Sequence, residues 1–125
     1  MRVVALVGDL LDRSKIAAVV PDAHFAAAPD DSAGADVVVI DVKAHPDAVT
    51  VARTLAPKAR IVAYGRHDNP AALEAARAGG ADAVLPRSRF FRDPAAAVTA
   101  ALPTVAAEPE PEKATDEDVG GDDSA

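Results

Sequence analysis

Two aspartates that follow apolar runs are the residues of this chain best placed to do chemistry. Asp41 ends the run Ala-Asp-Val-Val-Val-Ile-Asp, and Asp9 follows the run Val3 to Val7 after a single glycine. Two carboxylates at neighbouring strand ends could provide oxygen ligands for Mg²⁺, and one of them could act as a nucleophile. Alternatively, Asp9 caps a helix and Asp41 merely terminates a strand. Asp9 and Asp41 are therefore the candidate metal ligands, and Asp41 is the candidate reactive group.

A second candidate site is basic and aromatic. Arginines and a histidine follow two later apolar runs, with Phe90 and Phe91 between the last arginines; these basic residues are Arg66, His67, Arg87, Arg89 and Arg92. Guanidinium groups bind carboxylate and phosphate in two-point geometry, so Arg66, Arg87 and Arg89 are candidate contacts for an anion, a phosphorylated ligand or the acidic tail of the chain. Alternatively, the phenylalanines pack under the following helix, and the arginines are solvated or paired with Asp68 and Asp93.

The pattern of apolar residues predicts the elements that position these groups. Continuous β-branched runs are typical of parallel strands buried on both faces. We expect strands at residues 3–7, 24–28, 35–41, 60–64 and 83–85, and helices at residues 9–20, 46–55, 70–78 and 93–102, with a loop at 86–92. Strands that alternate with helices indicate an α/β fold with a parallel sheet. Residues 29–36 leave no room for a full helix before the third strand.

In such a sheet the carboxyl ends of the strands meet at one edge, where open α/β sheets bind ligands. We therefore expect one crevice there, lined by Gly8, Asp9, Asp41, Tyr64, Gly65 and Arg87. His45 and His67 also follow central strands, but no compact ligand motif supports a transition-metal site.

Composition limits the classes of function. The net charge of −7 arises from residues 103–125, which hold eight acidic residues against Lys113, whereas residues 1–102 are balanced. Balanced charge argues against nucleic-acid binding, and few large apolar residues predict a disordered acidic tail at 103–125. The chain has no cysteine, no phosphate-binding glycine loop, no apolar stretch long enough for a membrane span and no cleavable leader. We expect one folded domain, 1–102, in a cytoplasmic protein.

These motifs resemble those of the receiver domains of bacterial response regulators, the CheY-like domains. Asp41 after VVVI is similar to the phosphorylated aspartate of that family, Asp9 after VVALVG to one residue of its acidic pair, and AGGADAVLPR to the segment leading to its lysine. The resemblance implies a flavodoxin-like five-stranded sheet of order 2-1-3-4-5, with Mg²⁺-dependent transfer of a phosphoryl group from a partner histidine kinase to Asp41. It also implies a switch read on the last helices and strand.

The chain departs from the family at four points. Gly8 replaces the first member of the acidic pair, Tyr64 and Gly65 stand in place of a threonine or serine, and Arg87 after Pro86 replaces the lysine that a proline follows. The second helix is short or missing. Since arginine does not substitute conservatively for lysine at a tight site, we expect an atypical or pseudo-receiver. It would be a stand-alone signalling domain that acts through protein contacts rather than as an enzyme, with an anion-binding module as the alternative.

Overall fold

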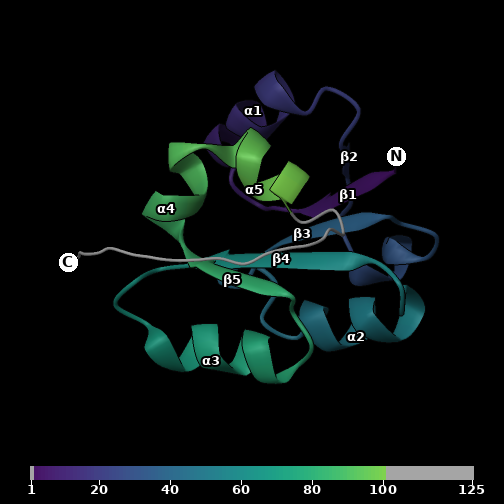
Figure 1. The fold of residues 1–125 in the computed structure, drawn as a ribbon, viewed down its shortest axis with the longest axis vertical. Helices are drawn as coiled ribbons and strands as arrows, with labels where there is room; N and C mark the ends of the chain where they lie inside the picture. Colours follow the sequence, from purple (N-terminus) through teal and green to yellow (C-terminus); the bar gives the residue numbers. More distant parts are fainter. Residues whose placement is uncertain (1, 101–125) are drawn as a thin grey trace.

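The computed structural model describes residues 2–100, so the acidic tail and the expected end of the last helix near residue 102 lie outside the described residues. Five parallel strands form one sheet of order β2-β1-β3-β4-β5 (Figure 1). This confirms the predicted five-stranded flavodoxin-like sheet. The strands are β1 (Val3–Leu6), β2 (His24–Phe25), β3 (Val37–Asp41), β4 (Arg60–Gly65) and β5 (Ala83–Pro86).

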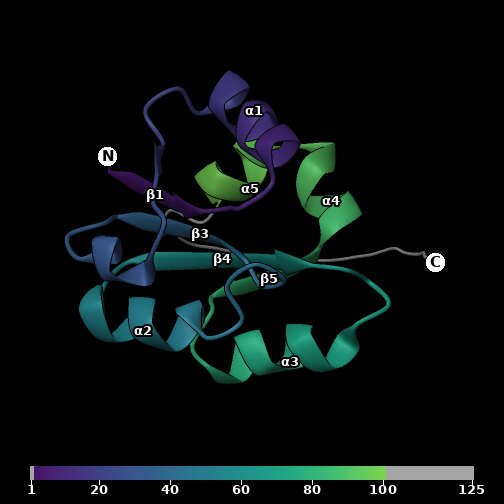
Figure 2. The same ribbon diagram turned by 180° about the vertical axis from the view of Figure 1, so that it is seen from behind.

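The helices cover both faces of the sheet. On one face lie α1 (Leu10–Val19), α4 (Arg87–Arg92) and α5 (Pro94–Ala100), and on the other lie α2 (Ala48–Leu55) and α3 (Pro70–Ala78), as Figures 1 and 2 show from opposite sides. A 3₁₀ turn, η1 (Pro29–Ser32), replaces a helix between β2 and β3. The expected shortage of chain at this point is therefore confirmed.

Burial on both faces explains the continuous apolar strands. All five residues of β3 and all four residues of β1 are buried. Successive side chains of β3 alternate between two clusters: Val38 and Ile40 pack toward α2 and α3, whereas Val37 and Val39 pack toward α1, α4 and α5. The sheet is thus a rigid central layer whose strand ends are fixed relative to one another.

Two expectations about local structure are wrong. The second strand has two residues, His24–Phe25, where residues 24–28 were expected, because the chain leaves β1 after the bond from the Ala26 N–H to the Ala5 carbonyl and enters the 3₁₀ turn at Pro29. The segment expected to be a loop, residues 86–92, is the end of β5 followed by helix α4. A helical turn lets Phe90 reach the core, where it is fully buried, while Arg89 and Arg92 on the same helix remain exposed.

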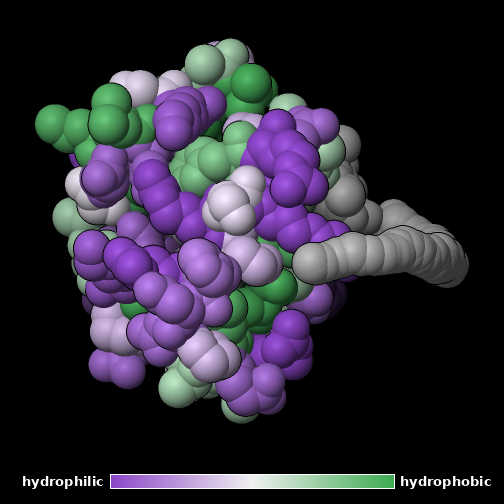
Figure 3. Space-filling model, turned by 90° about the vertical axis from the view of Figure 1, so that its left-hand side faces the viewer, coloured by the Kyte–Doolittle hydropathy of each residue, from purple (hydrophilic) through white to green (hydrophobic). Residues whose placement is uncertain are grey.

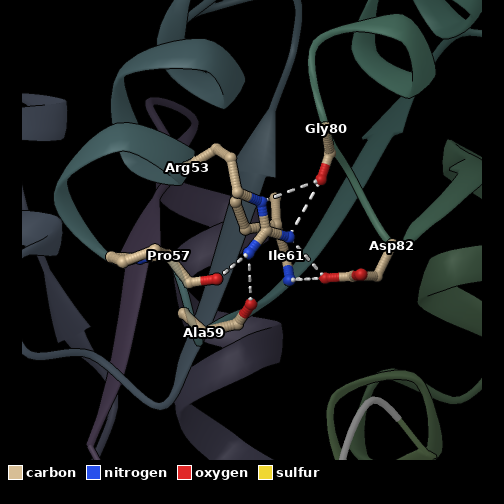
Figure 4. A network of polar contacts seen from close by, with 6 residues as sticks. All are labelled: Arg53, Pro57, Ala59, Ile61, Gly80 and Asp82. Carbon is tan, nitrogen blue, oxygen red and sulfur yellow. Dashed lines mark hydrogen bonds and ion pairs between the residues drawn. The ribbon is translucent and has the colours of Figure 1, made fainter.

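Arg53 connects three segments at the side of the sheet where β4 and β5 begin, which is opposite to the carboxyl ends of the strands. Figure 4 shows its contacts. Its guanidinium donates to the carbonyls of Pro57 and Ala59, both at 2.9 Å, and to the carbonyl of Gly80, and it forms a 2.7 Å ion pair with Asp82. The same oxygen, Oδ2 of Asp82, also accepts a 2.9 Å hydrogen bond from the backbone N–H of Ile61. The end of α2 is thereby tied to the beginnings of β4 and β5.

No helix within residues 2–100 combines the length and the apolar character needed to cross a bilayer.

We expect Arg53→Lys to lower the free energy of unfolding by about 2 kcal/mol, because a single ammonium cannot replace the forked donors that reach three carbonyls and a carboxylate. Urea denaturation measures the change. The matched control is Arg77→Lys, since the ion pair of Arg77 in the part of the chain that the structure describes is an exposed one with Glu74 at 3.2 Å, and such pairs contribute little. Equal losses in the two variants would contradict a special role for Arg53.

Candidate functional site

The carboxyl ends of the strands enclose a cavity of about 370 Å³. All six residues expected to line one crevice contribute to it, together with Asp12, Lys43, Ala44 and Arg66; the six are Gly8, Asp9, Asp41, Tyr64, Gly65 and Arg87. Figure 3 looks at this side of the molecule, where the surface is mainly hydrophilic and hydrophobic surface protrudes at the upper left. The structure therefore places Asp9 and Asp41 at the same rim.

Asp41 lies at the inner wall of this cavity. Its residue is only 8% exposed, and its Oδ1 accepts a 3.0 Å hydrogen bond from the backbone N–H of Lys43. Asp41 pairs in register with Tyr64 of β4. Side chains of paired residues point to the same face of a sheet, so the Asp41 carboxylate and the Tyr64 ring both face α1 and α4.

Asp9 has a defined structural role. Its Oδ1 accepts hydrogen bonds from the backbone N–H groups of Leu11, at 2.8 Å, and Asp12, at 3.2 Å, and so caps α1. The capping alternative considered for Asp9 is therefore observed, although the residue also lines the cavity. One of its oxygens is committed to the helix end.

The strongest polar interaction in the cavity involves a residue that the sequence analysis did not single out. Asp12 is only 1% exposed, and both of its oxygens accept hydrogen bonds at 2.5 Å from the two Nη atoms of Arg87, 75 positions further along the chain. The Tyr64 hydroxyl donates to Oδ2 of Asp12 at 3.0 Å. We call Asp12, Tyr64 and Arg87 the latch, because they connect α1, β4 and α4.

The helical spacing of Asp12 relative to the apolar residue Ile16 could have indicated that Asp12 is buried. It precedes Ile16 by four positions, and Ile16 is fully buried on α1. Residues four apart share a helix face, so Asp12 had to face the core, where a carboxylate requires a partner. The identity of that partner could not be read from spacing.

The pKa values of Tyr64 and Arg87 are shifted by burial and by the charges of the neighbouring carboxylates. Burial raises the pKa of the Tyr64 hydroxyl, and the negative charges of Asp41 and Asp12 raise it further. The hydrogen bonds to Asp12 raise the pKa of Arg87. Tyr64 is therefore a neutral phenol and Arg87 a charged guanidinium at ordinary pH.

Aromatic packing fixes Tyr64. Its ring stacks on Phe90 with centroids 4.7 Å apart and contacts the edge of Phe91 at 5.1 Å. Directly after it, Gly65 has no room for a side chain, since an added Cβ would lie 2.6 Å from Cγ2 of Val42. Bulky aromatic contacts on one side and a glycine on the other thus position the hydroxyl that reaches Asp12.

The arginines do not form one site. Arg66 and Arg87 line the cavity, whereas Arg89 and Arg92 do not. Arg66 also pairs with Asp68 at 2.8 Å on the surface, and its hydrogen bonds lower the pKa of Asp68 to about 2. The expected pairing with Asp68 is therefore present, but Arg87 is paired with Asp12 instead of Asp93.

The donor set fits Mg²⁺ poorly. Oδ1 of Asp9 and Oδ1 of Asp41 already accept backbone hydrogen bonds, and Asp12 is neutralised by Arg87. Arg87 is paired with Asp12 and Arg66 with Asp68, so Asp9, Asp41 and Lys43 leave only one net negative charge in the cavity to attract a dication. Within residues 2–100 no three His, Cys, Asp or Glu side chains are grouped as a metal site. Asp9 and Asp41 as Mg²⁺ ligands remain an untested prediction.

Comparison with known proteins supports the fold. No family model and no curated protein matches the sequence. Among solved structures, the BeF₃-activated DrrB receiver domain is similar, with a TM-score of 0.69 and 13% identity over 81% of this chain and 96% of that chain. A LuxR family DNA-binding response regulator from Silicibacter pomeroyi is also similar, with a TM-score of 0.60 and 19% identity over 82% and 92% of the two chains.

A third similar structure is a response regulator from Burkholderia pseudomallei that contains a phosphorylated aspartic acid, a calcium ion and citrate. Its TM-score is 0.65 at 14% identity, and the match covers 78% of this chain but only 65% of that one. The chain described here thus spans less than two thirds of that regulator. Together these likenesses show that the chain has the receiver-domain fold of response regulators.

We expect Tyr64 to stay un-ionised in the folded protein at pH values where an exposed tyrosine ionises, because its pKa lies above the ordinary value of about 10. Protons bound only by the folded state are lost on unfolding, so above about pH 10 the free energy of unfolding should fall by about 1.4 kcal/mol per pH unit. Ultraviolet titration reports Tyr64 alone, since the chain has one tyrosine and no tryptophan. Tyr64→Phe should remove this component, and ionisation at the same pH in folded and urea-unfolded protein would contradict it.

We expect Arg87→Gln to lower the free energy of unfolding by about 2–3 kcal/mol, because it leaves the Asp12 carboxylate buried without a counter-charge. The double variant Asp12→Asn with Arg87→Gln should recover part of this loss. Arg66→Gln is the control: it removes an exposed pair and should cost less than about 1 kcal/mol. Additive effects of the two latch substitutions in urea denaturation would show that the pair is not coupled.

Proposed function

We propose that the chain is an atypical receiver-type signalling domain that acts through protein contacts and is held in one conformation by the latch. The observation that carries this proposal is the engagement of Arg87 by the buried Asp12. In the family that the chain resembles, a lysine stands at the position of Arg87, and arginine does not replace it conservatively at a tight site. Here both Nη groups of that side chain are already hydrogen-bonded to a carboxylate.

Asp41 is the residue that would accept a phosphoryl group. Its residue lines the first cavity together with Lys43 and Arg87. Gly8 supplies no carboxylate, and Asp9 is partly committed to capping α1. The poor fit of this donor set for Mg²⁺, together with the latch, favours regulation that does not depend on a histidine kinase.

Protein contact is supported by the surface beside the cavity. Leu10 and Leu11, which follow the cavity residue Asp9, are 75% and 70% exposed. Two adjacent exposed leucines beside this cavity are suited to bind an apolar surface of a protein partner. The balanced charge of residues 1–102 favours such a partner over nucleic acid. A signalling domain of this kind transmits a conformation and needs no catalytic cycle of its own.

We expect no phosphoryl adduct when the full chain is incubated with Mg²⁺ and acetyl phosphate and its intact mass is measured. A phosphorylatable receiver domain treated in parallel is the positive control. An adduct on the parent chain that Asp41→Asn abolishes would contradict the proposal and establish a working phospho-acceptor.

The variant Gly8→Asp with Arg87→Lys makes this test sharper. It restores the second acidic residue and the lysine of the family, and a Cβ at position 8 meets only Cβ of Ala44 at 3.3 Å. We expect this variant to form an Mg²⁺-dependent adduct on Asp41. Such a gain would show that charge balance and the latch, and not the accessibility of Asp41, prevent phosphorylation of the parent chain.

A further inference from the structure

A second cavity of about 330 Å³ lies beside the first and has a different electrostatic character. Residues from three segments line it: Lys15 of α1, Arg66 and His67 after β4, and Arg87, Ser88 and Phe91 of α4. None of these lining residues is acidic. Since a cavity lined by one sign of charge concentrates ions of the opposite sign, this cavity is suited to an anion.

The ring of Phe91 lies close to two of the cationic groups, those of Lys15 and Arg87. The Nζ of Lys15 lies 5.3 Å from the centroid of the Phe91 ring, and the guanidinium carbon of Arg87 lies 4.8 Å from the same centroid. Cation–π attraction holds both groups there. Two positive charges around one ring repel each other, so an anion placed between them would stabilise the arrangement.

The donors are available to different degrees. Arg87 uses its Nη atoms for Asp12 but its side chain is 40% exposed. Among the described residues, Arg66 forms an ion pair with the exposed Asp68 alone. Lys15 has no ion pair within residues 2–100, and its side chain is exposed. The site therefore offers Lys15 first, the exposed side of Arg87 second, and Arg66 after exchange of its weak surface pair.

We propose that this cavity binds a small phosphate-bearing molecule, with Lys15, Arg66 and Arg87 contacting the phosphate and the Ser88 hydroxyl completing the set of donors. The N–H groups of Arg87 that Asp12 leaves free and the Lys15 ammonium are charged donors that suit phosphate. The volume lies at the lower end of the range for small-molecule sites, so a phosphomonoester with a small organic group fits. This inference is independent of phosphorylation at Asp41.

The two cavities share Arg66 and Arg87. An anion that binds the exposed N–H groups of Arg87 acts on the same guanidinium that holds Asp12, the partner that the Tyr64 hydroxyl also contacts. Binding at the second cavity therefore changes the surroundings of Tyr64, and the emission of this single tyrosine reports it.

The test uses the full chain, with inorganic phosphate and phenyl phosphate as probes at constant ionic strength. Backbone amide chemical shifts and thermal stability are followed during titration. We expect saturable shifts at Lys15, Arg87, Ser88 and Phe91, and we expect Lys15→Gln to weaken binding about tenfold through loss of one charge-assisted hydrogen bond. The matched controls are Arg89→Gln and Arg92→Gln, which remove the same charge from exposed positions of α4 outside the cavity.

Two results would overturn the proposal. The absence of saturable shifts with both probes excludes the site. Equal weakening by Lys15→Gln and Arg89→Gln would show that the anion is attracted by the positive charge of the surface in general and not by this cavity. Lys15 is exposed and lies outside the first cavity, so its substitution should preserve the fold. The phosphodonor experiment at Asp41 does not depend on Lys15, and failure of either proposal can therefore be distinguished from failure of the other.

Discussion

The ion pair between Asp12 and Arg87 is the constraint on which the functional edge depends. A carboxylate that is 1% exposed is costly unless it is paired and hydrogen-bonded. Here two guanidinium bonds and one phenol bond satisfy it. Because the three partners come from α1, β4 and α4, the satisfaction of one buried charge fixes the relative positions of the elements that form both cavities.

This pairing accounts for the local structure around it. Arg87 must begin a helix directly after β5 to reach back to α1, and Phe90 then enters the core where it stacks on Tyr64. Gly65 allows β4 to end close to Val42 and Leu73. The aromatic contacts and the polar latch therefore reinforce each other: the rings exclude water from the phenol, and the phenol hydrogen-bonds to the carboxylate.

The amino ends and the carboxyl ends of the strands are stabilised in different ways. At the edge where β4 and β5 begin, Arg53 is bound mainly to backbone carbonyls, which do not titrate and do not move independently of the strands. At the opposite edge, Arg87 is bound to a side chain and is partly exposed. Of the two arginines, only Arg87 can exchange hydrogen-bond partners without disturbing the strands. We therefore place signalling and ligand binding at the carboxyl ends of the strands.

The sequence by itself determined the central layer. The β-branched runs before Gly8 and Asp41 could be satisfied only by strands buried on both faces, and parallel strands bring Asp9, Asp41, Tyr64 and Arg87 to one edge. The sequence also predicted the short connection before β3, and it left the helix cap at Asp9 as one of two interpretations, because both features depend on neighbouring residues.

Only the tertiary structure decided how the charges pair. Asp12 and Arg87 are 75 positions apart, and several acidic residues were equally plausible partners for each arginine along the chain. Helix α4 was likewise mistaken for a loop, since six residues with two adjacent phenylalanines form a helix here only because the core accepts Phe90. Local propensity is weak over so short a segment, and burial, which depends on the whole fold, determined the outcome.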